Sequence, residues 1–366
     1  MKKILVIGLT ERMGGVETFI YNTTRFSDKS KYEYDFLCHG TEHTVFQNEI
    51  TKFYNGVNHF YFVPSFKHQP IASYKALNNF FRAHASEYAY VHLETGATSE
   101  IIYVLPFVKK YNLKVITHSH NGNGYSPVIN SLFRPAVNKV SIKELSCSKE
   151  ATDWLFGSSK ESDVEIINNG IDTHRFTFDA DARKRIRRKY KLTENDLVIG
   201  HIGRFSEQKN HKFILQVFAE VLKMNPNARL MLIGTGELEN EVKRQAEDLA
   251  IFDRVIWAGV HNNTEDYYSA FDVFFMPSLY EGLPVVGIES QSEGLPCVFS
   301  DQITQQLAIT DLCEFKPLND SVSDWARSIL SKRNAGEKRR LYAKKVAEAG
   351  YSIEATIKQL EKVYEV

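Results

Sequence analysis

Two glutamates separated by seven residues, Glu281 and Glu289, lie in the stretch FFMPSLYEGLPVVGIESQSEGLPCVFS, residues 274–300. The apolar run 271–276 predicts a buried parallel strand, and the residues after it predict a tight turn into a helix that begins near Pro284. Glu281 then lies in the turn before the helix, and Glu289 projects from its second turn. We therefore expect one carboxylate to face a reacting group and the other to face a neighbouring ribose.

The start of this helix is also a candidate anion site. Proline has no N–H, and a helix start leaves its first amides without partners, so Pro284 fits the first turn without losing a hydrogen bond. The amides of Leu283 and Val285, on either side of it, are then able to point at an anion.

Two cations follow another predicted strand, 197–202. Arg204 and Lys209 have four residues between them and lie in the loop that opens the predicted helix 213–223. A guanidinium and an ammonium at the carboxyl edge of a sheet suit a diphosphate, because arginine offers a fork of donors and lysine a point charge. Taken alone, a pair of exposed surface charges explains these residues equally well.

Two further strand ends carry glycine and should meet the same edge. The predicted strand 229–233 is followed by Gly234, and the predicted strand 255–258 by a glycine and Val260. Backbone groups at Gly234 and Val260 are therefore candidates for reading a nucleobase. Ordinary turn chemistry is the alternative for both positions.

The N-terminal strand, 3–9, precedes a glycine pair, Gly14 and Gly15, and then a helical pattern. A strand, a glycine loop and a helix start is the arrangement in which helix amides face a phosphate. The pair lacks the GxGxxG spacing, so a tight turn between strand and helix remains an equal explanation.

Two histidines follow a later strand, 114–117. His118 and His120 stand beside an asparagine and a glycine, where the ligand crevice of an open α/β sheet is found. A lone histidine is more often structural, but two at one strand end predict a functional role for at least one of them.

The elements that must hold these residues alternate regularly between strand and helix. This alternation predicts parallel sheets with helices on both sides. Further strands are predicted at 34–38, 59–63, 90–93, 144–147 and 164–167, and helices at 71–85, 100–111 and 148–156.

The 366 residues are too many for one ordinary core and suit two domains. We expect an N-terminal domain over 1–170, a second domain over 171–350, and a last helix over 351–366 that packs back on the first domain. The basic run 183–189 is expected near the link between them, as a solvated helix face.

Composition excludes several classes of protein. Lys plus Arg equals Asp plus Glu at 45 each, which gives no overall field for nucleic acid. The four cysteines form no CxxC pair, so neither a disulfide framework nor a zinc site is expected, and a reducing cytoplasm fits. The N-terminus lacks the features of a signal peptide, and no apolar run approaches the ~20 residues of a membrane span.

With GRFSEQKN at 203–210, GTGELE at 234–239 and above all EGLPVVGIE at 281–289, the chain resembles the family 4 retaining glycosyltransferases. That family has the GT-B architecture, in which two Rossmann-like domains with parallel sheets face each other across a cleft. The resemblance covers most of the chain and is strongest over 200–301. The N-terminal half is similar through MGGVETF and HSHN only.

The resemblance implies that the second domain binds a nucleotide-diphosphate sugar. Arg204 and Lys209 would hold the diphosphate and stabilise it as a leaving group. The amides of Leu283 and Val285 would assist them, and Glu289 would bind the ribose hydroxyls.

The resemblance also implies the remaining contacts. Glu281 would meet the donor sugar near the reacting carbon, where positioning is preferred to a nucleophilic role. Gly14 and Gly15 would approach the phosphate from the first domain. Either His118 or His120 would touch the sugar, because HSHN departs from the commoner single histidine.

No metal and no cofactor is implied, since the two cations and a helix start can carry the leaving charge. Two alternatives use the same fold: a sugar-nucleotide epimerase, and a non-catalytic sugar-nucleotide-binding partner of another transferase. A nicotinamide dehydrogenase is a weaker third, because no GxGxxG follows a strand.

Family members with the HSHN and MGGVETF motifs imply a glycan or lipid-linked glycan acceptor in capsule or exopolysaccharide assembly. We expect the donor to carry uridine sooner than guanine. Peripheral contact with the inner face of the membrane is one hypothesis, and an ordinary core helix is the alternative. The candidate membrane residues mix basic and apolar types: Phe80, Phe81, Arg82, Leu132, Phe133, Arg134, Lys139 and Lys143.

Overall fold

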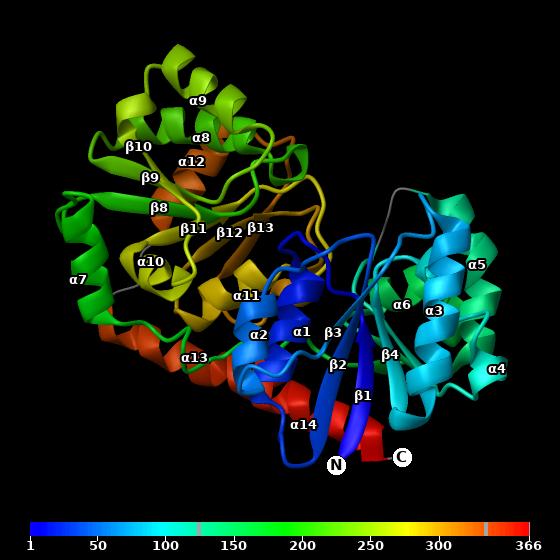
Figure 1. Ribbon diagram of the computed structural model, residues 1–366. Coiled ribbons are helices and arrows are strands. Elements are labelled where there is room, and N and C mark those ends of the chain that lie inside the picture. The colour runs from blue at the N-terminus through cyan, green and yellow to red at the C-terminus, as the bar shows by residue number, and fades with distance from the viewer. Residues whose placement is uncertain (123–125, 333–335, 366) are drawn as a thin grey trace. The chain divides into compact units, whose positions relative to one another are not determined.

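The computed structural model describes residues 1–122, 126–332 and 336–365. The chain divides into two compact units, one made of Met1–Gly170 with Ile353–Val366 and the other of Ile171–Ser352. Each unit is built on its own parallel sheet, as Figure 1 shows. The last residue of the predicted helix 351–366 lies outside the described residues.

The sheet of the first unit has seven strands in the order β3-β2-β1-β4-β5-β6-β7, and every pairing is parallel. Since parallel strands all end at one edge, the loops after β1, β4 and β5 meet there. The strands are β1 (Lys2–Ile7), β2 (Tyr32–His39), β3 (Phe60–Val63), β4 (Tyr90–Thr95), β5 (Val115–Ser119), β6 (Ser141–Ser146) and β7 (Glu165–Ile166).

The second sheet has six strands in the order β10-β9-β8-β11-β12-β13, again all parallel. From β8 the chain first adds β9 and β10 on one side, and it then adds β11, β12 and β13 on the other side. The strands are β8 (Leu197–Ile202), β9 (Ala228–Ile233), β10 (Val255–Gly259), β11 (Val273–Met276), β12 (Cys297–Ser300) and β13 (Cys313–Lys316).

Helices cover both faces of each sheet. The first unit contains α1 (Gly15–Phe26), α2 (Gln47–Phe53), α3 (Pro70–His84), α4 (Val108–Tyr111), α5 (Pro127–Val140), α6 (Lys149–Leu155) and α14 (Ile353–Glu365). The second contains α7 (Ala180–Lys189), α8 (His211–Met224), α9 (Glu239–Asp248), α10 (Thr264–Ala270), α11 (Val285–Ser292), α12 (Val322–Ser331) and α13 (Leu341–Val346).

The strands are apolar without interruption because both of their faces are buried. In β1, Leu5 packs with the residues of α3, whereas the neighbouring Ile4 packs on the opposite face with α1 and α14. Although α14 is the last helix of the chain, it lies beside β1 and β2 in Figure 1, and its Tyr364 packs with Ile4 and Tyr34 of these strands.

Three expectations need correction. The predicted helix 100–111 is a 3-10 helix, Thr98–Tyr103, followed by the short α4, because Pro106 interrupts a continuous α-helix. Strand β13 was not predicted at all. Its residues Cys313–Lys316 are only partly buried and mix charged with apolar side chains, as an edge strand does.

The basic run is not a wholly solvated face. In α7, Arg187 is 2% exposed, and its guanidinium donates to the Asp272 carboxylate at 3.3 Å and to the backbone oxygen of Asp196 at 2.7 Å. The second unit begins at Ile171, where the second domain was predicted to begin, so the basic run lies inside that unit. Among the described residues, no helix is both long and apolar enough to cross a membrane.

Candidate functional site

The second unit brings two sequence-predicted residues into direct contact. The Lys209 ammonium lies 2.6 Å from the Glu281 carboxylate, whose other oxygen accepts from the Gln208 amide at 3.1 Å. The side chains of Lys209 and Glu281 are only 15% and 9% exposed. The loop after β8 and the loop after β11 therefore meet at one point of the carboxyl edge.

Backbone and side-chain hydrogen bonds fix these two loops to each other. The Leu279 amide donates to the Gln208 oxygen at 2.8 Å, and the Asn210 side chain donates to the Pro277 oxygen at 3.1 Å. Asn210 has a left-handed φ of 56°, a conformation that asparagine tolerates better than most residues. The loops thus hold Lys209 and Glu281 in a defined relative position.

Arg204 lies in the same loop as Lys209 but is much more exposed. Its side chain is 58% exposed and pairs with the Glu237 carboxylate at 3.0 Å, and that glutamate is itself 52% exposed. An ion pair this open is worth about 0.2–1 kcal/mol. An incoming anion can therefore replace Glu237 at little cost.

Glu289 projects from α11 and accepts a hydrogen bond from the Tyr268 hydroxyl at 2.9 Å. Burial raises the pKa of the Glu289 carboxyl to about 7, although the Tyr268 hydroxyl and the Arg175 charge oppose the shift. The carboxyl is thus poised to change charge near neutral pH.

Helix α11 begins at Val285 with Pro284 as the residue that caps it. Pro284 has extended backbone angles, φ −72° and ψ 120°, so it precedes the helix instead of forming its first turn. The amides at the start of α11, that of Val285 among them, follow directly on the loop that carries Glu281 and Leu283. This is the geometry of an anion site at a helix N-terminus.

Gly234 and Val260 stand at the ends of β9 and β10. Gly234 has a φ of +136°, and a Cβ there would lie 2.1 Å from the Gly203 backbone oxygen, so the packing of the two loops already requires glycine. Val260 is 59% exposed beyond β10. The predicted role of both in base reading stays a prediction.

In the first unit, Gly14 caps α1 and Gly15 begins it. A Cβ on Gly15 would meet no heavy atom within 4 Å, whereas one on Gly14 would lie 2.8 Å from the Glu17 carboxylate. Glu17 is held by the Thr10 hydroxyl at 2.6 Å. The start of the helix therefore has free space beside Gly15, whereas the Glu17 carboxylate lies beside Gly14.

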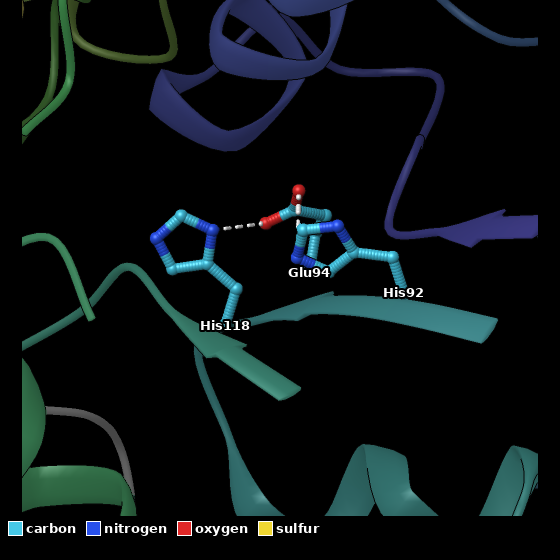
Figure 2. Close-up of side chains that lie close together, drawn as sticks. All are labelled: His92, Glu94 and His118. Carbon is cyan, nitrogen blue, oxygen red and sulfur yellow. Dashed lines mark ion pairs between the residues drawn. The ribbon is translucent and has the colours of Figure 1, made fainter. Parts of the chain in front are cut away.

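His118 and His120 lie at the end of β5 and converge on a carboxylate from the neighbouring β4. His120 Nε2 lies 2.6 Å and His118 Nδ1 3.0 Å from the same oxygen, Oε2, of Glu94. Glu94 is 3% exposed, and the Phe19 ring of α1 packs against both imidazoles. Figure 2 shows Glu94 and His118 pointing toward each other, with His92 from the same strand as Glu94 beside them.

Three of these side chains also have the geometry of metal ligands. One atom each from His92, Glu94 and His118 lies within 4.8 Å of the others. Glu94 is already engaged by His120 at 2.6 Å, so a cation at this point would compete with the His120 proton. His92 Nε2, 3.4 Å from Glu94 Oε1, makes no hydrogen bond among the described residues, and neither does His118 Nε2.

Sequence reasoning missed the partners of the predicted residues. Glu94, Glu237 and Tyr268 each contact at least one of the predicted residues. Each lies 21 or more residues along the chain from the residue that it contacts. The only signal available for Glu94 was its place at the end of the predicted strand 90–93, one position beyond the last apolar residue.

The comparisons with known proteins agree with this geometry. The sequence model described as Glycosyltransferase Family 4 matches residues 13–175, and the one described as Glycosyl transferases group 1 matches residues 182–334. The EpsF protein of Bacillus subtilis strain 168, named as a glycosyltransferase, is 31% identical over 376 residues, which cover 100% of this chain and 97% of EpsF.

An Escherichia coli enzyme named UDP-Gal:alpha-D-GlcNAc-diphosphoundecaprenol alpha-1,3-galactosyltransferase is 31% identical over 144 residues, 38% of this chain and 36% of that enzyme. Among solved structures, Anabaena Alr3699/HepE in complex with UDP and glucose superposes with a TM-score of 0.79 at 13% identity and covers 100% of both chains. The sucrose-phosphate synthase of Thermosynechococcus elongatus gives 0.75 at 16% identity, over 100% of this chain and 98% of that one.

The predicted fold class is confirmed, because both sheets are parallel and the structural neighbours are GT-B glycosyltransferases. The likeness to HepE and to the synthase shows the fold alone. The EpsF alignment shows the family as well, since it spans the whole chain at 31% identity. The chain therefore belongs to glycosyltransferase family 4 and is a GT-B glycosyltransferase.

Proposed function

We propose that the protein transfers a sugar from a nucleoside-diphosphate sugar to a glycan or lipid-linked glycan, with retention of anomeric configuration. The second unit binds the donor and the first unit binds the acceptor. The single observation that carries this proposal is the contact between Lys209 and Glu281, which joins the cation loop to the paired-glutamate stretch at 2.6 Å.

The chemistry follows from the charges at this edge. The bond between the sugar carbon and the diphosphate oxygen breaks, and negative charge collects on the diphosphate. Arg204, Lys209 and the amides at the start of α11 stabilise that charge, so the proposed reaction needs neither a metal nor a cofactor. The acceptor oxygen attacks from the face that the diphosphate leaves, and its proton passes to the departing diphosphate.

Glu281 is proposed to position the sugar and to stabilise positive charge at the reacting carbon. Its carboxylate is held by Lys209 and Gln208, which fixes its direction. A carboxylate so engaged is a weak nucleophile. The positioning role therefore suits it better than a covalent one.

Calorimetry against a panel of nucleoside diphosphates and their sugars tests the donor proposal. We expect one base to bind clearly better than the others, and uridine is the first to test because the E. coli relative is named for a UDP-galactose donor. If none of the nucleotides binds, the donor proposal fails.

Donor affinity should depend on pH through Glu289. Ribose hydroxyls donate best to an ionised carboxylate, and the Glu289 pKa of about 7 means that raising the pH from 6 to 8 ionises it. We expect the dissociation constant of an intact nucleotide sugar to fall by up to about ten-fold over this range. Calorimetry at both pH values measures it.

The matched control for that experiment is Glu289→Gln, which keeps the shape of the side chain but has no proton to lose. It should bind the donor more weakly than the native protein does at pH 8, with little dependence on pH. An undiminished pH slope in this variant would show that another group is responsible.

The acceptor proposal includes contact with a membrane surface at the cytoplasmic face. The candidate residues need revision, because Phe80 and Phe81 are 9% and 1% exposed and belong to the core. Helix α5 does present exposed apolar side chains, among them Val128 at 81% and Leu132 at 73%. The name of the E. coli relative includes a diphosphoundecaprenol acceptor, which supports a lipid-linked acceptor for this chain.

Sedimentation with vesicles tests this surface. We expect the native protein to sediment with anionic vesicles and the double variant Val128→Ser with Leu132→Ser to sediment several-fold less, since each side chain would bury apolar area in the interface. A protein that stays in the supernatant with and without anionic lipid would remove the membrane contact and leave the transferase proposal intact.

A further inference from the structure

We propose that Tyr268 is a positioning residue for the donor, because its hydroxyl aims the Glu289 carboxylate at the ribose hydroxyls. This inference rests on the proposed function, in which Glu289 binds the ribose. It adds to the site a residue that acts on the donor only through another side chain. It also makes the preference of the site for ribose depend on one hydroxyl group.

The Tyr268 hydroxyl has both of its acceptors on helix α11. It donates to Glu289 Oε2 at 2.9 Å and to the Val286 backbone oxygen at 3.2 Å. An ionised carboxylate is the stronger acceptor, so the hydroxyl turns to Glu289 whenever that group is charged. Burial raises the pKa of Tyr268 well above its usual value, and the Glu289 charge raises it further, so the hydroxyl keeps its proton.

One oxygen of the Glu289 carboxylate is left for a ligand. Glu289 is half-buried, and its Oε1 makes no hydrogen bond within the part of the chain that the structure describes. A carboxylate that is held at one oxygen presents the other in a fixed direction. The contact with Tyr268 therefore decides where Oε1 points.

The ring of Tyr268 is itself fixed by packing. Tyr268 is 0% exposed, and the centroid of its ring lies 5.7 Å from that of Phe274 and 6.0 Å from those of Phe176 and Phe271. The substitution Tyr268→Phe keeps these ring contacts and removes the hydroxyl alone. It therefore isolates the contact with Glu289.

A buried arginine fixes the ends of the two helices to each other. Arg339 is 3% exposed, and its guanidinium donates to the backbone oxygens of Tyr268, Phe271 and Glu293, each at 3.0 Å. Tyr268 lies near the end of α10, and Glu293 directly follows α11. The hydroxyl on α10 is thus held at a set distance from the carboxylate on α11.

The titratable and charged groups that face Glu289 come from α10 and from the segment before α7. Tyr268 and Glu265 belong to α10, and Arg175 belongs to that segment. Arg175 pairs with the Glu265 carboxylate at 2.7 Å. Burial raises the Glu289 pKa, and the Tyr268 hydroxyl is the largest of the influences that oppose burial. The hydroxyl therefore assists the charged form of Glu289 as well as directing it.

The test is the ribose preference of Tyr268→Phe, with Tyr267→Phe as the matched control. Calorimetry measures the preference as the ratio of the dissociation constants of 2′,3′-dideoxyuridine diphosphate and uridine diphosphate. Another base replaces uracil in both probes if the nucleotide panel selects it. Tyr267 is the neighbouring residue of α10 and is 1% exposed, but its hydroxyl pairs with His261 at 2.7 Å and with Lys189 at 3.0 Å.

At pH 8 the native protein should prefer the ribose form by about ten-fold or more, because hydrogen bonds to a charged group are among the stronger ones. Tyr267→Phe should keep that preference. In Tyr268→Phe the preference should fall to about three-fold or less, because the carboxylate is no longer aimed. Affinity for the dideoxy form and kcat at saturating donor should not change, since the substitution leaves Glu281 and Lys209 in place.

Three results would overturn the proposal. One is an undiminished ribose preference in Tyr268→Phe. Another is an equal loss of affinity for the ribose and dideoxy forms, because that result reports a distorted site. The third is a full recovery of the preference in Tyr268→Phe at pH 9, because the hydroxyl would then only assist the ionisation of Glu289 without aiming it.

Failure of the proposed function would look different. A native protein that binds neither form of any nucleoside diphosphate would sink the donor proposal and this inference with it. A native ribose preference that Glu289→Gln loses and Tyr268→Phe keeps would leave the donor proposal intact and overturn only the role of Tyr268.

Discussion

Replacing Glu281 by glutamine is expected to lower kcat by about two orders of magnitude, with donor affinity nearly unchanged. The structure explains why kcat and donor affinity should respond differently. Glu281 neutralises Lys209 at 2.6 Å, so removing its charge frees the ammonium for the diphosphate, and this gain offsets the lost contact with the sugar and leaves donor affinity nearly unchanged. The same change removes the carboxylate that is proposed to face the reacting carbon, and the loss should appear only in the transition state.

Steady-state kinetics at saturating donor, together with calorimetry, would measure both quantities. Glu237→Gln is the matched control, because Glu237 also neutralises a cation of the same loop, Arg204, at 3.0 Å. That variant should keep its kcat. If Glu281→Gln loses donor affinity in proportion to kcat, Glu281 is a binding residue and the positioning role is wrong.

The double variant Arg204→Ala with Lys209→Ala should bind the donor at least about a hundred-fold more weakly. Hydrogen bonds to charged groups are worth about 1.5–3 kcal/mol each, which corresponds to ten-fold or more for each residue. Lys209 should contribute more than Arg204, because its side chain is 15% exposed and that of Arg204 is 58% exposed, and solvent screens the latter.

The control is Lys223→Ala, which removes a 73% exposed cation paired with Glu220 on α8 and should leave donor binding unchanged. Competition calorimetry with the nucleoside diphosphate alone separates diphosphate contacts from sugar contacts. Unchanged affinity in the double variant would remove the diphosphate role from both residues.

Much of the fold could be predicted from the sequence, because parallel strands that are buried on both faces appear as unbroken apolar runs. Residues 197–202 were predicted as a strand with the bounds that β8 has in the structure. Strand β13 escaped because Glu314 and Lys316 interrupt its apolar pattern at the edge of the sheet. The interruption of the helix at Pro106 could have been predicted from the loss of a backbone donor alone.

The candidate site could be predicted from the sequence only in part. Types and spacing indicated Glu281 and Lys209, but the contact between them joins positions 72 residues apart and depends on how β8 and β11 pair. Glu94 was out of reach for the same reason, since its partners His118 and His120 belong to the neighbouring strand. Pairing between strands is set by the whole sheet and leaves no mark in the local sequence.

The central claim is that this chain moves a sugar from a nucleoside-diphosphate donor with retention. Its most direct test is proton NMR of the reaction of native protein with the donor selected by calorimetry and a panel of glycan and lipid-linked acceptors. The account predicts one equivalent of nucleoside diphosphate for each new glycosidic bond, and an anomeric coupling in the product that matches the donor. A product of inverted configuration, or a freed or epimerised sugar with no bond to an acceptor, would contradict it.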